Sequence, residues 1–498
     1  MPENDAIYQE RLASLRNQIE NLALDGLIIP RTDEFQGEFL APYAERLAWL
    51  TGFTGSAGAA VILSDKAVVM SDGRYTIQLA QQVNSNLYQT ADSTKTSVGQ
   101  WIAGQGDEGL RIGYDAWLHT PSQIEKINED LVGTNITLVP VAENPVDAVW
   151  YDQPAKPLGE VIIFPDDIAG KTSKEKRSEI TEKLKKDGIS ASLITMSDSI
   201  CWLLNIRGAD IDFSPLVLSY AVLYDDGTLD WFVDSAKISD EVRASLGNEI
   251  IIKPIDQIEN VLGNIDGYVA MDTTTAPIAF ENIIVKTGGE YKTQTDPCAA
   301  PKAIKTLNEQ AAIRDAHIKD GIAIVKFLKW LDDYANNIEV NELSVEERLE
   351  EFRRECPEYL GASFSTIAGF AGNGAIVHYR ATPETSKGIK GDGLLLVDSG
   401  GQYKWGTTDI TRTIGIGAPT QEMKENYTRV LKGHIALASA KFKQGTCGKD
   451  IDALARKPLQ DAGLDYAHGT GHGVGCYLCV HEDAAHISPR GLRELQDG

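Results

Sequence analysis

The chain has 498 residues, and at about 150 residues per domain this length predicts about three domains. Hydrophobic residues make up 42% and charged residues 24%, an ordinary globular composition that excludes wholesale disorder. The formal net charge is −25, from 72 acidic and 47 basic residues. Because so negative a surface repels phosphate groups, we expect neither nucleic acid nor a membrane surface as a partner.

The N-terminal segment and the cysteines both point to the cytoplasm. The segment MPENDAIYQERLASLR is charged and has no apolar stretch, so no secretory signal is predicted. Six cysteines in so long a chain do not make a disulfide framework and favour a reducing compartment. Cys476 and Cys479 form a single CxxC pair, for which we favour two half-buried strand thiols over a metal or redox role.

The first two thirds of the chain contain a weak internal repeat. Residues 11–29 have the pattern of an amphipathic helix that runs through Asp-Gly into an apolar strand, and residues 177–195 repeat it. A Trp-Leu step follows each, at Trp49 and at Trp202. The recurrence predicts two copies of one α/β domain, although helices joined to strands by Asp-Gly are common enough to recur by coincidence.

Two proline-containing segments indicate domain boundaries. Gln153–Pro157 is typical of a linker, and a second boundary lies near Pro297–Pro301, before a long helical pattern. We therefore expect domains at residues 1–158, 159–300 and 301–498.

The third domain is predicted to open with two helices. Four apolar side chains at helical spacing predict the buried face of the first: Ile318, Ile322, Val325 and Leu328. The second is expected to begin at Ser344, which forms a capping box with Glu347. Its predicted buried side consists of Val345, Leu349 and Phe352.

Two aspartates follow or lie within predicted strands. The apolar strand 394–397 ends at Asp398, and a second strand, 407–416, carries Asp409. A carboxylate in such a place is costly to bury unless it is paired or bound to a cation, and paired carboxylates suit divalent metals. The alternative is that Asp398 caps a turn while Asp409 pairs with Arg412.

Histidines gather in the same part of the chain. Six of the eight lie after residue 370: His378, His434, His468, His472, His481 and His486. The glycines around His468 and His472 exclude a stable helix but leave His472 free to bind a metal as a neutral imidazole; the alternative is a surface turn with idle histidines. His378 and His481 are each expected to end a strand. There each is either a core histidine or a proton-transfer or carbonyl-polarising group beside a metal-activated water.

The ordered motifs of this region resemble those of the pita-bread metallopeptidases, and most of all the three-domain, cytosolic type of Xaa-Pro aminopeptidase. The motifs are NGAIVHY, LLLVDSGGQYKWGTTDITRT, LKGHIALASAKF and HGTGHGVGCYLCVHE. Further segments extend the resemblance over nearly the whole chain: Tyr43–Gly58, Asp72–Tyr75, Leu203–Asp210 and Lys302–Leu331.

The resemblance implies an α/β (α+β) chain with two creatinase-like N-terminal α/β domains followed by a C-terminal pita-bread domain. The implied reaction is release of the N-terminal residue from peptides whose second residue is proline. Two divalent metal ions are implied as cofactors, most often manganese, with cobalt and zinc as alternatives. A homodimer is implied as well.

Residue roles carry over by position. Asp398 would bind one metal, Asp409 would bridge both, and His472 would bind the other. His378 and His481 would contact the substrate and the tetrahedral intermediate. The remaining residue, His468, would line the pocket near the scissile bond.

The family's metal site also contains two glutamates, and by this resemblance both positions fall beyond Gly498. Neither Glu482 nor Glu494 has the expected sequence context. We therefore expect a fragment whose pita-bread domain lacks its last strands, and the 498 residues alone are not expected to be active.

Three other functions are consistent with the same scaffold. A prolidase cleaves Xaa-Pro dipeptides, but the two N-terminal domains favour the aminopeptidase. Creatinase uses no metal and has no need of Asp398, Asp409 and His472 together. A non-catalytic peptide- or protein-binding module is the alternative outside enzymes, against which the same residues argue.

Overall fold

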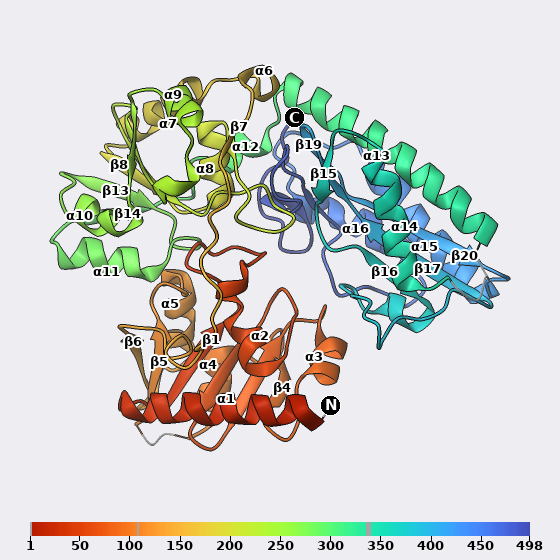
Figure 1. Ribbon diagram of the computed structural model, residues 1–498, viewed down its shortest axis with the longest axis horizontal. Coiled ribbons are helices and arrows are strands. Elements are labelled where there is room, and N and C mark those ends of the chain that lie inside the picture. The colour runs from red at the N-terminus through yellow and green to blue at the C-terminus, as the bar shows by residue number, and fades with distance from the viewer. Residues whose placement is uncertain (1, 107–108, 335–339) are drawn as a thin grey trace. The chain divides into compact units, whose positions relative to one another are not determined.

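The computed structural model describes residues 2–106, 109–334 and 340–498 (Figure 1). The chain divides into two compact units. The first contains most residues up to Cys298, and the second contains Ala299–Gly498 together with residues 164–171 and 213–215. The three-domain division at 1–158, 159–300 and 301–498 stays a prediction.

The first unit begins with a mixed six-stranded sheet in the order β4-β3-β2-β1-β5-β6. Its strands are β1 (Gly26–Pro30), β2 (Ala59–Leu63), β3 (Ala67–Ser71), β4 (Gln89–Asp92), β5 (Arg111–Asp115) and β6 (Thr137–Val141). Strands β1, β2 and β3 are antiparallel neighbours, whereas β4, β5 and β6 join in parallel. Apolar side chains cover both faces because alternate residues of β1 enter different cores, Leu27 and Ile29 on one side and Ile28 on the other.

Helices cover this sheet. Helix α1 (Pro2–Asn21) contributes Leu12, Leu15 and Ile19 to the core that contains Leu27. The core on the other face receives side chains from α4 (Val98–Ala103) and α5 (Pro121–Asp130). The shorter helices are α2 (Arg46–Thr51) and α3 (Thr76–Gln82). The result is an α/β arrangement with its sheet between helices.

The second sheet repeats the first, with the order β12-β11-β10-β8-β13-β14. Its strands are β8 (Ala191–Ile194), β10 (Tyr220–Tyr224), β11 (Leu229–Phe232), β12 (Ile250–Lys253), β13 (Tyr268–Met271) and β14 (Glu290–Thr293). The sequence of antiparallel and parallel neighbours is the same as in the first sheet. Helix α7 (Ser173–Lys186) precedes β8 as α1 precedes β1, so the predicted repeat is confirmed.

The remaining elements of the first unit are short. Strands β7 (Ile162–Ile163) and β9 (Ile206–Arg207) pair with each other. The helices are α8 (Ser197–Leu204), which carries Trp202, α9 (Asp240–Leu246), α10 (Ile258–Leu262) and α11 (Ile278–Lys286).

The second unit contains several small sheets. Strands β16 (Ile367–Phe370), β17 (Gly393–Ser399) and β20 (Ile410–Ile416) form one antiparallel sheet. A second consists of β15 (Tyr359–Ala362), β18 (Gly401–Tyr403) and β19 (Gly406–Thr407), and a third pairs β21 (Gly471–Gly473) with β22 (Glu482–Ile487). The helices are α6 (Asp166–Ala169), α12 (Ala299–Ala303), α13 (Leu307–Tyr334), α14 (Glu342–Arg354), α15 (Gln421–Ala438) and α16 (Gly448–Gln460). Across the described ranges no helix combines the length and hydrophobicity needed to span a membrane.

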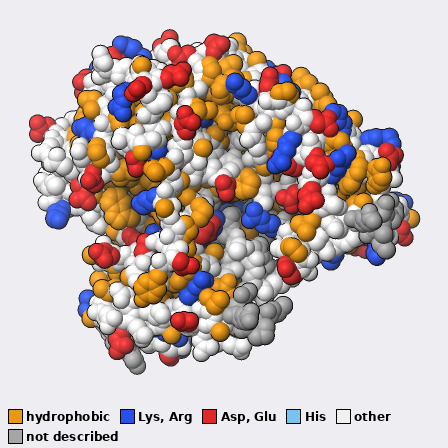
Figure 2. All heavy atoms as spheres, in the orientation of Figure 1, with side chains coloured by type: hydrophobic (Ala, Val, Ile, Leu, Met, Phe, Trp, Pro, Cys, Tyr) orange, Lys and Arg blue, Asp and Glu red, His pale blue; other side chains and the backbone are white. Residues whose placement is uncertain are grey.

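Helix α13 buries a different face from the predicted one. Ile318, Ile322 and Val325 are 66%, 55% and 66% exposed, and hydrophobic side chains reach the surface over this helix (Figure 2). The buried side instead includes Ala316, Asp320, Ala323, Ile324, Phe327 and Leu331. Leu328, the fourth predicted residue, is partly buried against the same core. Apolar residues lie on two faces of α13, so helical spacing alone does not show which face is buried. The buried face also carries the charged residue Asp320, which made it look like the exposed face.

The predicted start of α14 is also wrong. Asn341 is the N-cap: its side chain accepts from the backbone N–H of Ser344, and the Ser344 side chain accepts in return from Asn341. The helix therefore begins two residues before Ser344. Val345 and Leu349 are buried as predicted, and Phe352 is partly buried against the same core.

Substitutions on the two faces of α13 test this assignment. Phe327→Ala removes a ring from the core and is expected to lower the free energy of unfolding by about 3–5 kcal/mol. Ile322→Ala changes an exposed side chain and is expected to cost less than about 0.5 kcal/mol. Thermal and urea denaturation of both variants measures the difference. Equal losses would contradict the observed orientation of the helix.

Candidate metal centre

The site is built from strand ends of the second unit. Side chains along β17 alternate between buried and partly exposed, which puts Leu395, Val397 and Ser399 on the buried face and Asp398 on the other. Asp398 pairs in register with Thr411 of β20, and the Thr411 hydroxyl donates to its Oδ1 at 2.6 Å. Asp398 therefore does not cap a turn.

The predicted continuous strand 407–416 is interrupted at Thr408 and Asp409. Strand β19 ends at Thr407 and β20 begins at Ile410, so Asp409 lies in the break between them. Its Oδ2 lies 3.3 Å from His472 Nε2. Arg412, the alternative partner for Asp409, donates to the Thr411 carbonyl oxygen at 2.7 Å.

His472 lies on β21, and both of its ring nitrogens have a polar neighbour. Nδ1 is 2.8 Å from the carbonyl oxygen of Gly473, and because a carbonyl only accepts, Nδ1 carries a proton. In the neutral imidazole Nε2 then presents a lone pair to Asp409 Oδ2. Two lone pairs 3.3 Å apart repel unless a proton or a cation lies between them.

His481 completes the group of four residues. Its ring meets that of His472 edge to face, with centroids 4.6 Å apart and an interplanar angle of 87°. His481 immediately precedes β22, so the prediction that it ends a strand is wrong. Because β22 pairs with β21, the strand pair holds both histidines together.

The other two predicted residues, His468 and His378, lie outside β21 and β22. His468 stacks on Tyr466, with centroids 4.7 Å apart, and its Nδ1 is 2.7 Å from the Gly469 carbonyl oxygen. His378 is partly buried in the turn after the 3-10 helix η4 (Ala371–Ala375) and does not end a strand as predicted. Glycines around η4 replace the strand with a turn.

Cys476 and Cys479 also differ from the prediction that they lie in strands. They belong to the irregular segment between β21 and β22, where Cys476 is buried and Cys479 is partly exposed. The Cys476 thiol donates to the Trp405 carbonyl oxygen at 3.4 Å.

Burial has the largest effect on the electrostatics of Asp398. Removal from water raises the pKa of Asp398 to about 6, the Thr411 hydroxyl lowers it, and the neighbouring Asp409 carboxylate raises it. A like-charge carboxylate pair of this kind is stabilised by a proton or by a cation.

The donor set fits a divalent metal in type, though not as a preformed cage. Two carboxylates and an imidazole nitrogen are ligands that manganese, cobalt and zinc accept. Within the described part of the chain, no group of three or more His, Cys, Asp or Glu side chains already stands at metal-binding spacing. Asp409 and His472 are in direct contact, and a cation binding between them would have to separate them.

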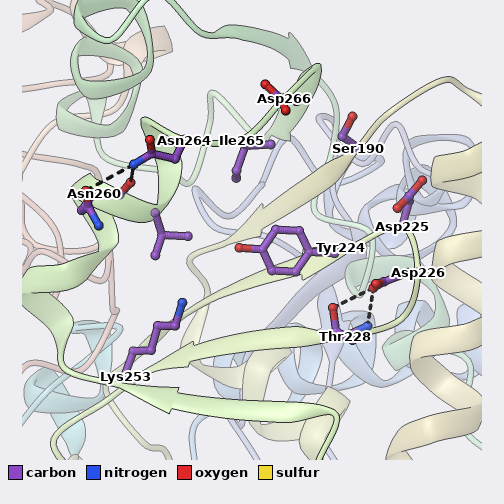
Figure 3. A pocket seen from close by; sticks show the side chains of 11 residues that line it. Ser190, Tyr224, Asp225, Asp226, Thr228, Lys253, Asn260, Asn264, Ile265 and Asp266 are labelled. Atoms are coloured by element: carbon purple, nitrogen blue, oxygen red, sulfur yellow. Dashed lines mark hydrogen bonds between the residues drawn. The ribbon is translucent and has the colours of Figure 1, made fainter.

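A hollow of about 600 Å³ elsewhere contains none of these residues (Figure 3). It lies at the edge of the second sheet in the first unit, where Asp226 accepts from Thr228 and Lys253 pairs with Asp230. Since these groups already have partners within the protein, the paired aspartates of the second unit remain the candidate site.

Sequence reasoning missed the buried residues behind the aspartates. Asp320 of α13 and Arg353 of α14 form a salt bridge whose hydrogen bonds reach Ser399 and Thr408. Ser399 and Thr408 are the direct chain neighbours of Asp398 and Asp409. An aspartate within the apolar pattern of α13 was the available signal.

Comparison with known proteins now bears on the whole chain. Residues 11–149 and residues 152–309 each match the Creatinase/Prolidase N-terminal domain, and residues 311–498 match metallopeptidase family M24. This confirms the expected order of two creatinase-like domains followed by a pita-bread domain.

Relatives match over nearly the full chain. A protein of Coccidioides posadasii named "Probable Xaa-Pro aminopeptidase P" is 37% identical over 97% of this chain and 81% of its own length. A protein of the same name from Laccaria bicolor is 38% identical over 97% of this chain and 76% of its own length.

Solved structures agree with these relatives. The X-prolyl aminopeptidase of Caenorhabditis elegans, described as a cytosolic enzyme with a di-nuclear active site, matches with a TM-score of 0.92 at 31% identity. The match covers 98% of this chain and 83% of the C. elegans chain. The prolidase of Pyrococcus horikoshii matches with a TM-score of 0.53 at 24% identity over 65% of this chain and 87% of its own, a likeness of fold. The chain therefore belongs to metallopeptidase family M24, and within it to the Xaa-Pro aminopeptidase P proteins.

Proposed function

We propose that the protein is a metal-dependent aminopeptidase that releases the first residue from peptides with proline in second position. The observation that carries the proposal is the meeting of Asp398, Asp409 and His472, with His472 Nε2 3.3 Å from the Asp409 carboxylate. The relatives named Xaa-Pro aminopeptidase P support the substrate class.

The proposed metal ligands are Asp398 for one ion, Asp409 as the bridge, and His472 for the other. When bound, the two cations supply a water of lowered pKa and a positive charge for the developing oxyanion. The Gly473 carbonyl fixes the His472 tautomer that leaves Nε2 available, and Thr411 orients Asp398 through its hydroxyl. The two further glutamate ligands implied by the resemblance stay a prediction.

The other histidines would act on the peptide. His481, whose ring packs edge to face on His472, would donate a hydrogen bond to the tetrahedral intermediate. His378 is proposed to contact the substrate as well, and His468 to line the pocket near the scissile bond. Aromatic stacking on Tyr466 orients the His468 ring.

Three further features are proposed with the function. Manganese is the proposed metal, since carboxylate oxygens suit it. The proposed number of two ions is supported by the description of the C. elegans structure as di-nuclear. A cytoplasmic location is proposed from the description of that relative as cytosolic. A homodimer is proposed from the family resemblance alone.

The activity assay tests the proposal. The protein is incubated with manganese and the peptide Arg-Pro-Pro, and release of arginine is measured for residues 1–498 and, in parallel, for the chain extended through the codons that follow Gly498. Arg-Ala-Ala and the dipeptide Arg-Pro serve as comparison substrates. We expect the extended chain to cleave Arg-Pro-Pro, whether or not residues 1–498 alone do so; preference for Arg-Pro would indicate a prolidase.

Asp409→Asn is expected to lower this activity by on the order of 100-fold or more, because it removes a charged metal ligand. The matched control is Asp461→Asn, an exposed aspartate at the end of α16, which is expected to leave activity unchanged. If neither chain cleaves with any divalent metal, the peptidase proposal fails and a binding module takes its place.

Manganese affinity is expected to fall as pH falls through 6. The raised pKa of Asp398, about 6, means that its carboxyl holds a proton below that pH, and the metal must displace it. Above pH 7 the carboxylate is ionised and no proton competes. Isothermal titration at pH 7.5, 6.5 and 5.5 in two buffers of different ionisation enthalpy measures both affinity and released protons. A constant affinity without proton release would contradict the assignment.

A further inference from the structure

Asp320 is a buried carboxylate with four donors. Oδ1 accepts from Arg353 Nε at 2.8 Å and from the Tyr403 hydroxyl at 3.1 Å. Oδ2 accepts from Arg353 Nη2 at 3.2 Å and from the Thr408 hydroxyl at 2.5 Å. The side chains of Asp320 and Arg353 are 0% and 1% exposed. A charge pair this deep persists only when its hydrogen-bonding groups are satisfied, as they are for this carboxylate.

Two arms of this network reach the candidate metal centre. Thr408 directly precedes Asp409, and Ser399, which accepts from Arg353 Nη2 at 3.0 Å, directly follows Asp398. Because neighbouring residues of a strand point to opposite faces, anchoring Ser399 on the buried face fixes Asp398 on the other.

Every polar group of Thr408 forms a hydrogen bond within the protein. Its N–H donates to the Gly401 carbonyl at 2.9 Å, and its carbonyl accepts from the Ser363 hydroxyl at 2.8 Å. Its hydroxyl accepts from the Gly401 N–H at 2.9 Å while it donates to Asp320. A Cβ at Gly400 would lie 2.0 Å from the Thr408 carbonyl oxygen, so only glycine permits this approach. The residue before Asp409 is thus fixed although it lies outside a strand.

We propose that Asp320 and Arg353 are positioning residues for the metal centre, acting through the Thr408 hydroxyl on Asp409 and through Ser399 on Asp398. The inference rests on the proposed metal-dependent function. In this proposal the hydrogen bond from the Thr408 hydroxyl to Asp320 helps to set where Asp409, in the break between β19 and β20, meets His472.

Three small substitutions distinguish an effect on the position of Asp409 from an effect on the stability of the protein. Thr408→Val removes the hydroxyl and keeps the shape, whereas Thr408→Ser keeps the hydroxyl. Tyr403→Phe removes one donor from the other oxygen of Asp320, and Tyr403 contacts neither aspartate of the centre in any bond described above. These variants avoid Asp320→Asn, which risks unfolding because it disrupts the buried pair directly.

Manganese titration of the protein gives the first readout. Thr408→Val is expected to weaken manganese binding about 10- to 100-fold, and Thr408→Ser and Tyr403→Phe by less than about threefold. Melting temperatures of all three are measured alongside. Loss of affinity in Tyr403→Phe equal to that in Thr408→Val, or in proportion to lost stability, would overturn the proposal.

The metal-free protein gives the second readout. With histidines isotopically labelled, the His472 imidazole signals are expected to shift in Thr408→Val, since Asp409 loses its place, and to stay unchanged in the other two variants. Unchanged His472 signals in Thr408→Val would also overturn the proposal. If the signals shift as expected but the parent protein binds no manganese, the proposed function fails and the positioning role stands.

Discussion

The buried salt bridge between Asp320 and Arg353 connects the helical layer of the second unit to the strand ends that carry its chemistry. It joins α13 to α14 and reaches β17 and the segment after β19. Taking both charges out of water is costly, and the hydroxyls of Tyr403, Thr408 and Ser399 offset part of that cost through their hydrogen bonds. The positions of Asp398 and Asp409 therefore depend on how the interior behind them is packed.

On the more exposed side of the same strands, the two aspartates have no such oppositely charged arginine beside them in the bonds described above. Asp398 and Asp409 are two carboxyl groups held close together, and His472 Nε2 lies 3.3 Å from Asp409. Two carboxylates this close disfavour each other's charged form, so a proton or a bound cation stabilises the pair. A hydrogen-bonded buried pair behind two neighbouring carboxylates is an arrangement that suits metal binding.

Much of the architecture was predictable because it depends on local patterns. The helix-to-strand repeat at 11–29 and 177–195 anticipated two sheets with the same strand order. Motif resemblance identified Asp398, Asp409, His472 and His481, and the structure brings these four together. Burial of α14 through Val345 and Leu349 followed from helical spacing.

The failures arose where tertiary contacts outweigh local pattern. Helix α13 has apolar residues on two faces, and its buried face includes a charged residue whose partner lies 33 positions away, so spacing selected the exposed side. The break at Thr408 and Asp409 has no signal in a β-rich stretch, because Asp320 and Ser363 create it from other elements. Neither contact is visible in periodicity.

The central claim is that Asp398, Asp409 and His472 hold divalent metal. The most direct test is an anomalous difference map from crystals grown with manganese, collected on both sides of the manganese absorption edge. The account predicts anomalous density beside Asp409, between Asp398 and His472, with the Asp409 to His472 contact opened. Density at another place, or none while the protein is folded and saturated with manganese, would contradict it.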